Sequence, residues 1–286
     1  MDQISRRKVV QGAAAAVAMT LGAPSVRAQK DKQILRFGAE ADLKILDPVW
    51  TTAYITRNHG YLVYDTLFGT DASFRIKPQM VDRTIVSSDG MKYTFRLRDG
   101  LRWHDGKPVL SEDCVESLKR WGKKDRLGQL LMAHTGKIGA VDNRTLTLEL
   151  VEPFGLVLDA LGKTGGNVPF MMPARIASTS PEEQFKEVIG SGPFKFAKDE
   201  WKPGEQIEYL RNADYIPRDE APSGSTGGKK VYLDKVIWRH TADPWDAAED
   251  LTAGEVDWWQ EPPLDFMPKI EQNPWRKRLA IARRDF

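Results

Sequence analysis

The stretch from Thr84 to Trp121 constrains the fold more than any other part of the sequence; it reads TIVSSDGMKYTFRLRDGLRWHDGKPVLSEDCVESLKRW. Asp-Gly pairs at 89–90, 99–100 and 105–106 indicate tight turns, because glycine tolerates a positive φ and aspartate bonds its own backbone. Between the first two turns, apolar and polar residues alternate over 93–98. Alternation with a period of two predicts a strand with one buried face.

A helix is expected after the last of these turns. Ser111 has a side chain that can cap it, and acidic residues follow in the first turn, where they suit the helix dipole. Four apolar residues then recur at helical spacing, namely Cys114, Val115, Leu118 and Trp121. From spacing alone, a generic hairpin followed by an amphipathic helix explains the stretch equally well.

The same stretch resembles the signature of the family 5 bacterial extracellular solute-binding proteins, which are the dipeptide, oligopeptide and nickel-binding subunits of ABC importers. The resemblance rests on Ser88, Asp89, Gly90, Tyr93, Thr94, Phe95, Leu97, Arg98, Gly100, Trp103, His104, Asp105, Gly106, Pro108, Asp113 and Ser117. It implies an α/β fold of the type II periplasmic binding protein class, with mixed β-sheets and flanking helices. It also implies a periplasmic receptor, expected to be a monomer, that delivers a short peptide or similar small solute to an ABC importer permease.

Three further landmarks of that family are matched along the chain. The first is Leu46-Asp47-Pro48 followed by Tyr64, Asp65 and Leu67. The second joins Gly190-Ser191-Gly192-Pro193-Phe194 to Gly204 and Arg211-Asn212-Ala213-Asp214-Tyr215. The third is Ala253-Gly254-Glu255-Val256-Asp257. The resemblance runs from about Ile34 to Asn273. It implies a discontinuous first subdomain, 33–46 and 166–273, and an inserted second subdomain, 47–165.

The resemblance also implies which residues line the ligand cleft. They are the segment after Leu46-Asp47-Pro48 and the residues after Asp257, and the segment 127–134 resembles a further cleft segment by its offset from the signature helix. The crossing at 165–169 suits a return of the chain between the subdomains. The expected ligand-binding residues are Trp50, Thr51, Thr52, Ala53, Tyr54, Asn167, Trp258, Trp259, Gln260 and Glu261. Adjacent residues of a strand point to opposite faces, so one tryptophan of the 258–259 pair is expected in the core and the other free to stack on a ligand. Trp50 and Tyr54 are alternatively ordinary surface or core aromatics.

Local patterns predict further elements outside these landmarks. Ile34 to Phe37 is expected to form the first strand, and apolar spacing predicts a buried helix over 61–68. A short helix is expected to start at Pro181, and the Gly- and Ser-rich segment 221–230 is expected to form an exposed loop before a strand over 231–238.

Two helix termini can be placed from single residues. Asp243, followed by proline, predicts a helix start, and Gly254 predicts its end.

The first 28 residues are expected to be a twin-arginine signal peptide. Arg6 and Arg7 precede a mild apolar stretch, and cleavage is expected after Ala28. The apolar stretch is shorter than the about 20 residues that a spanning helix needs. A soluble periplasmic protein exported by the twin-arginine machinery is therefore expected. The alternative is an amphipathic N-terminal helix of the fold.

Charge and cysteine content narrow the class of partner. The net charge is +2, but four of the basic residues lie before residue 29, so the remaining charges nearly cancel. A near-neutral chain gives no reason to expect nucleic acid or an anionic membrane as partner. Cys114 is the only cysteine, so no intramolecular disulfide can form, and it is expected to be a small buried residue.

The chain has 286 residues, and members of the family are roughly twice as long. The resemblance therefore implies that the C-terminal lobe is missing, through truncation or a partial record. The segment 274–286 is expected to be an aberrant tail. Since the absent lobe closes the cleft in the family, weak solute binding or none is expected of the chain as it stands.

An exported hydrolase with unrecognised acid and base carboxylates is the competing class of function, and a structural or adhesive protein is a third. The four histidines show no metal-ligand spacing, and neither a zinc motif nor a serine elbow occurs. The segment 224–230 departs from a phosphate loop, because its glycines are one residue too close and Lys230 stands where Ser or Thr is required. No metal, cofactor or catalytic residue is therefore expected.

Overall fold

The structure is a computed structural model that describes residues 33–185 and 187–272. Arg6, Arg7, the cleavage site after Ala28 and the segment 274–286 lie outside the described residues. Among the helices of the described part, none is both long and apolar enough to cross a membrane.

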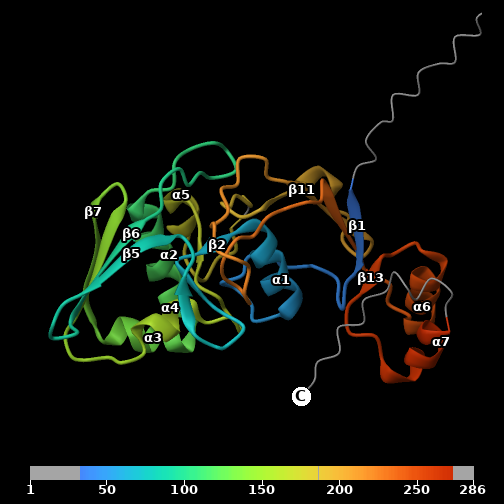
Figure 1. Cartoon of the computed structure of the whole chain (residues 1–286), viewed down its shortest axis with the longest axis horizontal. Helices are drawn as coiled ribbons and strands as arrows, with labels where there is room; N and C mark the ends of the chain where they lie inside the picture. Colours follow the sequence, from blue (N-terminus) through green and yellow to red (C-terminus); the bar gives the residue numbers. More distant parts are fainter. Residues whose placement is uncertain (1–32, 186, 273–286) are drawn as a thin grey trace, which may run out of the picture. The chain divides into compact units, whose positions relative to one another are not determined.

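The described chain forms mixed sheets with flanking helices (Figure 1). The strands are β1 (Ile34–Gly38), β2 (Asp65–Thr66), β3 (Phe68–Thr70), β4 (Ile76–Pro78), β5 (Val81–Val86), β6 (Lys92–Leu97), β7 (Thr135–Asp142), β8 (Thr145–Leu150), β9 (Phe170–Met171), β10 (Phe194–Phe196), β11 (Gln206–Arg211), β12 (Lys235–Arg239) and β13 (Trp258–Trp259). The helices are α1 (Tyr54–Val63), α2 (Ser111–Lys124), α3 (Arg126–Ala133), α4 (Val157–Gly162), α5 (Ala174–Ala177), α6 (Pro244–Ala253) and α7 (Met267–Glu271), with 3-10 turns η1 (Lys198–Glu200) and η2 (Leu264–Phe266).

The predicted strand and helix of the 84–121 stretch are both present. β6 is the second strand of an antiparallel sheet in the order β5-β6-β8-β7, and it buries Phe95 and Leu97. Helix α2 packs on β7 and β8 of this sheet through the four apolar residues expected to face the core. The Asp-Gly turns are confirmed, since Gly90, Gly100 and Gly106 have φ of 71°, 76° and 83°.

The helix start differs in detail from the prediction. Ser111 is the first residue of α2 and does not cap it. The carboxylate of Asp113 accepts the N–H of Leu110 at 2.8 Å instead. The Ser111 hydroxyl donates to the carbonyl of Asp142, which lies at the end of β7. The contact of Ser111 with the sheet therefore replaces the expected cap, and Asp113, expected only to suit the helix dipole, bonds the backbone at the helix start.

A second sheet has the strand order β10-β11-β12-β1-β13. The strand expected over Ile34 to Phe37 is confirmed as β1, which runs parallel to both of its neighbours. Phe37 pairs with Trp238 of β12 on one side and with Trp258 of β13 on the other. β1 therefore lies inside the sheet, although its two partner strands come from the far end of the described chain.

Buried apolar residues form three clusters. The first, around Trp121, consists of residues from Leu67 to Met171 in the sequence. The second, around Tyr209, combines residues from Ala39 to Tyr64 with residues from Val168 to Trp238. The third is small and joins α6 to α7. Helix α1 and the loop before it pack in the second cluster, and the subdomain boundaries expected near 47 and 165 stay a prediction.

Two predicted helices, over 61–68 and from Pro181, are not found as expected. The helix expected over 61–68 ends at Val63, and the next residues form β2 and β3. The apolar run belongs partly to a helix and partly to short strands. Periodicity alone cannot distinguish a short buried strand from a buried helix. The short helix expected at Pro181 is a turn, in which Glu183 donates to Ser180 at 2.9 Å.

The Gly- and Ser-rich segment 221–230 is not the exposed loop that was expected. Thr226 is buried, and Ser225 exchanges hydrogen bonds with the backbone of Thr70 at the end of β3. Gly224 has a φ of 56°, and a Cβ there would lie 2.4 Å from the Thr70 carbonyl oxygen. The glycines therefore allow close packing against the β3–β4 hairpin. The strand expected over 231–238 is confirmed only from Lys235 onwards.

The helix expected between Asp243 and Gly254 is confirmed as α6. The Asp243 carboxylate accepts the N–H of Trp245 at 2.7 Å, and Gly254 ends the helix with a φ of 79°.

Candidate functional site

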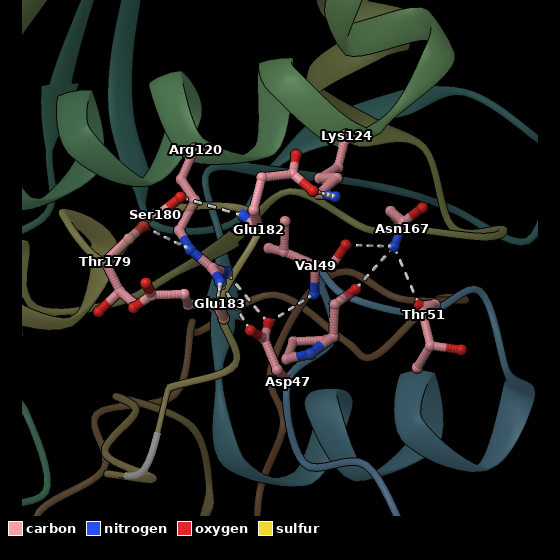
Figure 2. A network of polar contacts seen from close by, with 11 residues as sticks. Asp47, Val49, Thr51, Arg120, Lys124, Asn167, Thr179, Ser180, Glu182 and Glu183 are labelled. Atoms are coloured by element: carbon pink, nitrogen blue, oxygen red, sulfur yellow. Dashed lines mark hydrogen bonds and ion pairs between the residues drawn. The ribbon is translucent and has the colours of Figure 1, made fainter.

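The segment expected to line the cleft begins with a buried ion pair (Figure 2). Arg120, on α2, donates to both carboxylate oxygens of Asp47, at 3.0 and 2.6 Å. The same guanidinium donates to the backbone carbonyls of Thr179 and Glu183, and Asp47 also accepts the N–H of Val49. Asp47 is the acid of the Leu46-Asp47-Pro48 landmark, so this ion pair fixes that landmark to the signature helix.

Asn167 fixes the next residues of the loop. Its side-chain amide donates to the carbonyls of Pro48, Val49 and Thr51 at 3.0, 3.0 and 2.9 Å (Figure 2). The backbone carbonyl of Asn167 accepts the indole N–H of Trp121 at 2.8 Å. The amide nitrogen thus donates its hydrogen bonds to the backbone of the loop. Asn167 is only 7% exposed, so little of it can reach solvent. This geometry makes it a residue that positions the loop.

The loop held in this way presents aromatic side chains to solvent. Trp50 is 36% exposed, and its ring lies 5.3 Å from the ammonium group of Lys124. Tyr54, the first residue of α1, is 56% exposed, and the Arg57 guanidinium lies 4.3 Å from its ring centroid. Thr52 and Ala53, between them, are also exposed. These side chains are therefore accessible from solvent.

The expected residues after Asp257 lie on the edge of the β1 sheet. Trp258 is 52% exposed and makes an edge contact with Phe37, whereas Trp259 is half-buried against Phe266. Gln260 donates its N–H to the carbonyl of Gly38 at 2.9 Å. The two tryptophans differ in exposure, but neither is fully buried, since Trp259 is only partly buried against the α6–α7 cluster.

Electrostatic contacts relate these two groups of residues. Burial raises the pKa of the Glu40 carboxyl, the nearby carboxylate of Glu261 raises it further, and the Arg57 guanidinium opposes the rise. Glu261 is exposed and has a φ of 52°, which is uncommon for a residue with a side chain. Glu40 thus lies close enough to Glu261 and to Arg57 for both charges to affect its pKa.

A cavity of about 580 Å³ opens beside α1. Its walls are α1, the β3–β4 hairpin, Thr164 and the loop around 224–229. The lining residues are Arg57, Asn58, Tyr61, Thr70, Asp71, Ala72, Phe74, Thr164, Gly224, Ser225 and Lys229. The volume falls in the range of small-molecule sites, about 300–1,000 Å³.

His104 of the signature loop has a structural part in this arrangement. Its Nδ1 accepts the N–H of Gly190 at 3.3 Å, so the proton lies on Nε2, which donates to the carbonyl of Gly192 at 3.1 Å. Burial lowers the pKa of His104 to about 4, against a smaller opposing effect of the Gly192 carbonyl. A neutral imidazole with both nitrogens engaged holds the signature loop to the Gly190–Phe194 landmark.

Two buried carboxylates connect further matched residues. Asp113 accepts the indole N–H of Trp103 at 3.0 Å and the N–H of Ala174 at 2.7 Å. Asp65 accepts the hydroxyl of Tyr215 at 3.0 Å and pairs with the Lys229 ammonium group at 2.9 Å. The matched motifs therefore mainly hold segments distant in sequence together.

Arg57 and Arg120 are the residues that the sequence reasoning missed. Arg120 carried no signal, because neither charge nor spacing distinguishes a buried arginine on a helix. Arg57 would have been found on α1 if the helix had been placed at 54–63 instead of 61–68.

Comparison with known proteins gives consistent matches. The family described as bacterial extracellular solute-binding proteins, family 5 Middle, matches residues 75–283. A probable peptide ABC transporter periplasmic-binding protein, y4tO of Sinorhizobium fredii NGR234, is 44% identical over 98% of this chain and 53% of its own length. The glutathione-binding protein GsiB of Pectobacterium atrosepticum is 27% identical over 98% of this chain and 50% of its own.

Solved structures agree with the sequence matches. DppA of Helicobacter pylori, in complex with the peptide STSA, gives a TM-score of 0.68 at 26% identity, covering 86% of this chain and 50% of that one. AgaA of A. tumefaciens R10, in complex with agropinic acid, gives 0.67 at 26% identity, covering 84% and 46%. The chain spans about half the length of the curated relatives it matches. It belongs to the family 5 bacterial extracellular solute-binding proteins and has their mixed α/β fold.

Proposed function

We propose that this chain recognises solute as part of a periplasmic receptor, which passes a short peptide or similar small solute to the permease of an ABC importer. The observation that carries the proposal is the match of residues 75–283 to a family of solute-binding proteins. The surface agrees with it, since Trp50, Tyr54 and Trp258 are exposed on backbone segments that the fold holds in place. The names of the family and relatives indicate a transport binding protein and not an enzyme.

Two segments contact the solute in this proposal. One is 50–54, where the aromatic rings offer stacking surfaces and Thr51 and Thr52 offer hydroxyl groups. The other is 258–261, where Trp258 stacks and Gln260 and Glu261 add polar groups. Asn167 belongs to the site through the loop that it positions. In such a receptor, affinity comes from enclosing the ligand between lobes.

The solute class rests on the names of relatives. They mention peptides, glutathione and agropinic acid, molecules that each carry a carboxylate. A peptide-like solute is therefore the first class to test.

Delivery to the periplasm is part of the same proposal. Arg6 and Arg7 direct the precursor to the twin-arginine machinery, and cleavage after Ala28 releases a soluble receptor that acts as a monomer. The periplasmic relative supports the compartment. The twin-arginine route rests on the sequence of the first 28 residues.

An NMR titration with trialanine tests the function, because NMR detects weak as well as tight binding. We expect saturable shifts of the indole signals of Trp50 and Trp258, with no new signals from cleaved peptide. Trp245 provides an internal control, because it is 64% exposed but belongs to the α6 region. Hydrolysis of trialanine, or equal shifts of all three indoles, would contradict the proposal.

A further inference from the structure

The cavity beside α1 contains an arginine whose charge is not matched by a close carboxylate. Arg57 is half-buried, stacks on Tyr54 with 4.3 Å to the ring centroid, and lines the cavity. Among the described residues, the guanidinium donates hydrogen bonds only to the amide oxygen of Asn58, from Nε at 3.4 Å and from Nη2 at 3.1 Å. Within the described residues, no carboxylate lies within ion-pair distance of it. The Arg57 charge lowers the pKa of the Glu40 carboxyl from beyond ion-pair distance.

The other charged residues of the cavity wall already have partners. The Lys229 ammonium group lies 2.9 Å from the buried carboxylate of Asp65. The Asp71 carboxylate accepts the N–H groups of Ser73 and Arg75 and pairs with the Arg75 side chain at 3.1 Å. Among the described residues that line the cavity, Arg57 is therefore the one charged residue without a charged partner at ion-pair distance, and an anionic ligand group can neutralise it.

We propose that Arg57 binds a carboxylate group of the solute inside this cavity. The guanidinium has five N–H donors in a planar fork, of which three have no acceptor among the described residues. That fork matches the two oxygens of a carboxylate, and stacking on Tyr54 already fixes its plane. The inference rests on the proposed function, because it names the chemical group that the receptor recognises.

The rest of the wall suits a small organic molecule. Asn58, Thr164 and Ser225 bring polar side chains to the same cavity. Phe74 stands at its rim, 89% exposed, with a φ of 61°. A bulky residue in that conformation is an outlier, and such strain is typical of binding sites. Phe74 therefore offers an apolar surface next to the carboxylate group.

Four probes test whether the cavity prefers a carboxylate to an amide, and whether the carboxylate must belong to a peptide. Trialanine and trialanine amide differ only in the C-terminal carboxylate, and succinate and succinamide make the same comparison without a peptide. Each is titrated into the full chain and followed by the NMR signals of Asn58, Thr164 and Ser225. We expect at least one acid to bind about tenfold more tightly than its amide, as expected for a charge-assisted hydrogen bond. Which acid does so identifies the source of the carboxylate.

Variants of Arg57 complete the test. Arg57→Gln should reduce binding of the acid to the level of the amide and leave the amide unchanged, and Arg57→Lys should bind with intermediate affinity. Arg126→Gln is the matched control, because Arg126 is exposed on α3 and does not line the cavity. Thermal unfolding of each variant shows that it is folded.

Each result has a distinct meaning. If acid and amide bind equally, or if Arg57→Gln leaves the preference for the acid intact, the carboxylate site is wrong while the receptor function stands. If none of the four probes binds, both the site and the proposed solute class are wrong.

Discussion

The Arg120 guanidinium meets the Asp47 carboxylate across 73 residues of sequence, in a pair whose side chains are 2% and 0% exposed. A buried pair of this kind contributes little over an apolar pair of equal size, because both charges must lose their water. Removing one partner is different, since it leaves the other charge buried alone. The pair therefore acts mainly to specify where the 47–53 loop lies on α2.

Arg120→Met should lower the free energy of unfolding by about 3–5 kcal/mol, because the Asp47 carboxylate stays buried without a cation. Urea unfolding measures the change. Lys119→Met is the control on the same helix, since its pair with Glu116 is exposed and should contribute about 1 kcal/mol or less. Similar losses in the two variants would show that the buried pair has no special role.

Trp103→Ala should cost about 3–5 kcal/mol, because the ring is 3% exposed and packs in the first core cluster. The change also leaves the Asp113 carboxylate without one of its donors. Trp245→Ala, at a ring that is 64% exposed, is the control and should cost far less. An unchanged melting temperature for Trp103→Ala would refute the placement of the signature loop in the core.

Phe74→Gly should raise the free energy of unfolding by about 1 kcal/mol, because glycine adopts a positive φ without steric cost. The same change should weaken binding of the preferred acid, since it removes the apolar rim of the cavity. Tyr232→Gly is the control: it is 73% exposed without a positive φ, and should lose stability by about 0.5–1 kcal/mol. Destabilisation by Phe74→Gly would argue against backbone strain at that position.

Acid should destabilise the fold through two buried histidines. Burial lowers the pKa of His59 to about 3 and that of His104 to about 4, whereas both titrate near 6.5 when unfolded. Between about pH 6.5 and pH 4, only the unfolded chain takes up these protons, so stability falls as the pH falls. The expected slope is up to about 1.4 kcal/mol per pH unit for each histidine.

Urea unfolding at several pH values measures that slope, and His104→Gln should remove about one histidine's share of it. Stability that stays constant from pH 6.5 to pH 4.5 would contradict the placement of both buried rings.

Export should depend on the arginine pair before the apolar stretch. Arg6→Lys together with Arg7→Lys should leave the precursor in the cytoplasm, because the paired arginines are the specific feature of a twin-arginine signal. Immunoblots of cytoplasmic and periplasmic fractions measure the distribution, with Lys8→Arg as a control that keeps the pair. Normal periplasmic accumulation of the double variant would exclude the twin-arginine route.

The sequence predicted best where local chemistry and packing agree. The Asp-Gly turns, β6, the buried face of α2 and the capped α6 all depend on spacing within a few residues. Prediction failed where a distant segment supplied the deciding contact. The carbonyls of Thr179 and Glu183 accept from Arg120 in place of a helical turn, and the 221–230 segment is buried by the β3–β4 hairpin.

The candidate site was predictable only in part for the same reason. The exposed aromatics at 50, 54 and 258 follow from their place after matched landmarks. The use of Asn167 as a backbone clamp depends on three carbonyls that lie 116 to 119 residues away in sequence. Four segments that are separate in the sequence line the cavity beside α1. No local sequence pattern predicts that these segments lie side by side.

The position of β1 has a consequence for how the protein folds. Gln33, immediately before β1, donates its backbone N–H to the carboxylate of Asp234, 201 residues later in the chain. Because β1 lies between β12 and β13, its sheet cannot be completed until residue 259, the last of β13, has left the ribosome. Contacts so distant in sequence make folding slow, because the loop must close before the strands gain from pairing. Nascent chains should thus carry an unpaired β1 until β12 and β13 have been synthesised, and a chaperone that covers this strand should raise the yield of folded protein.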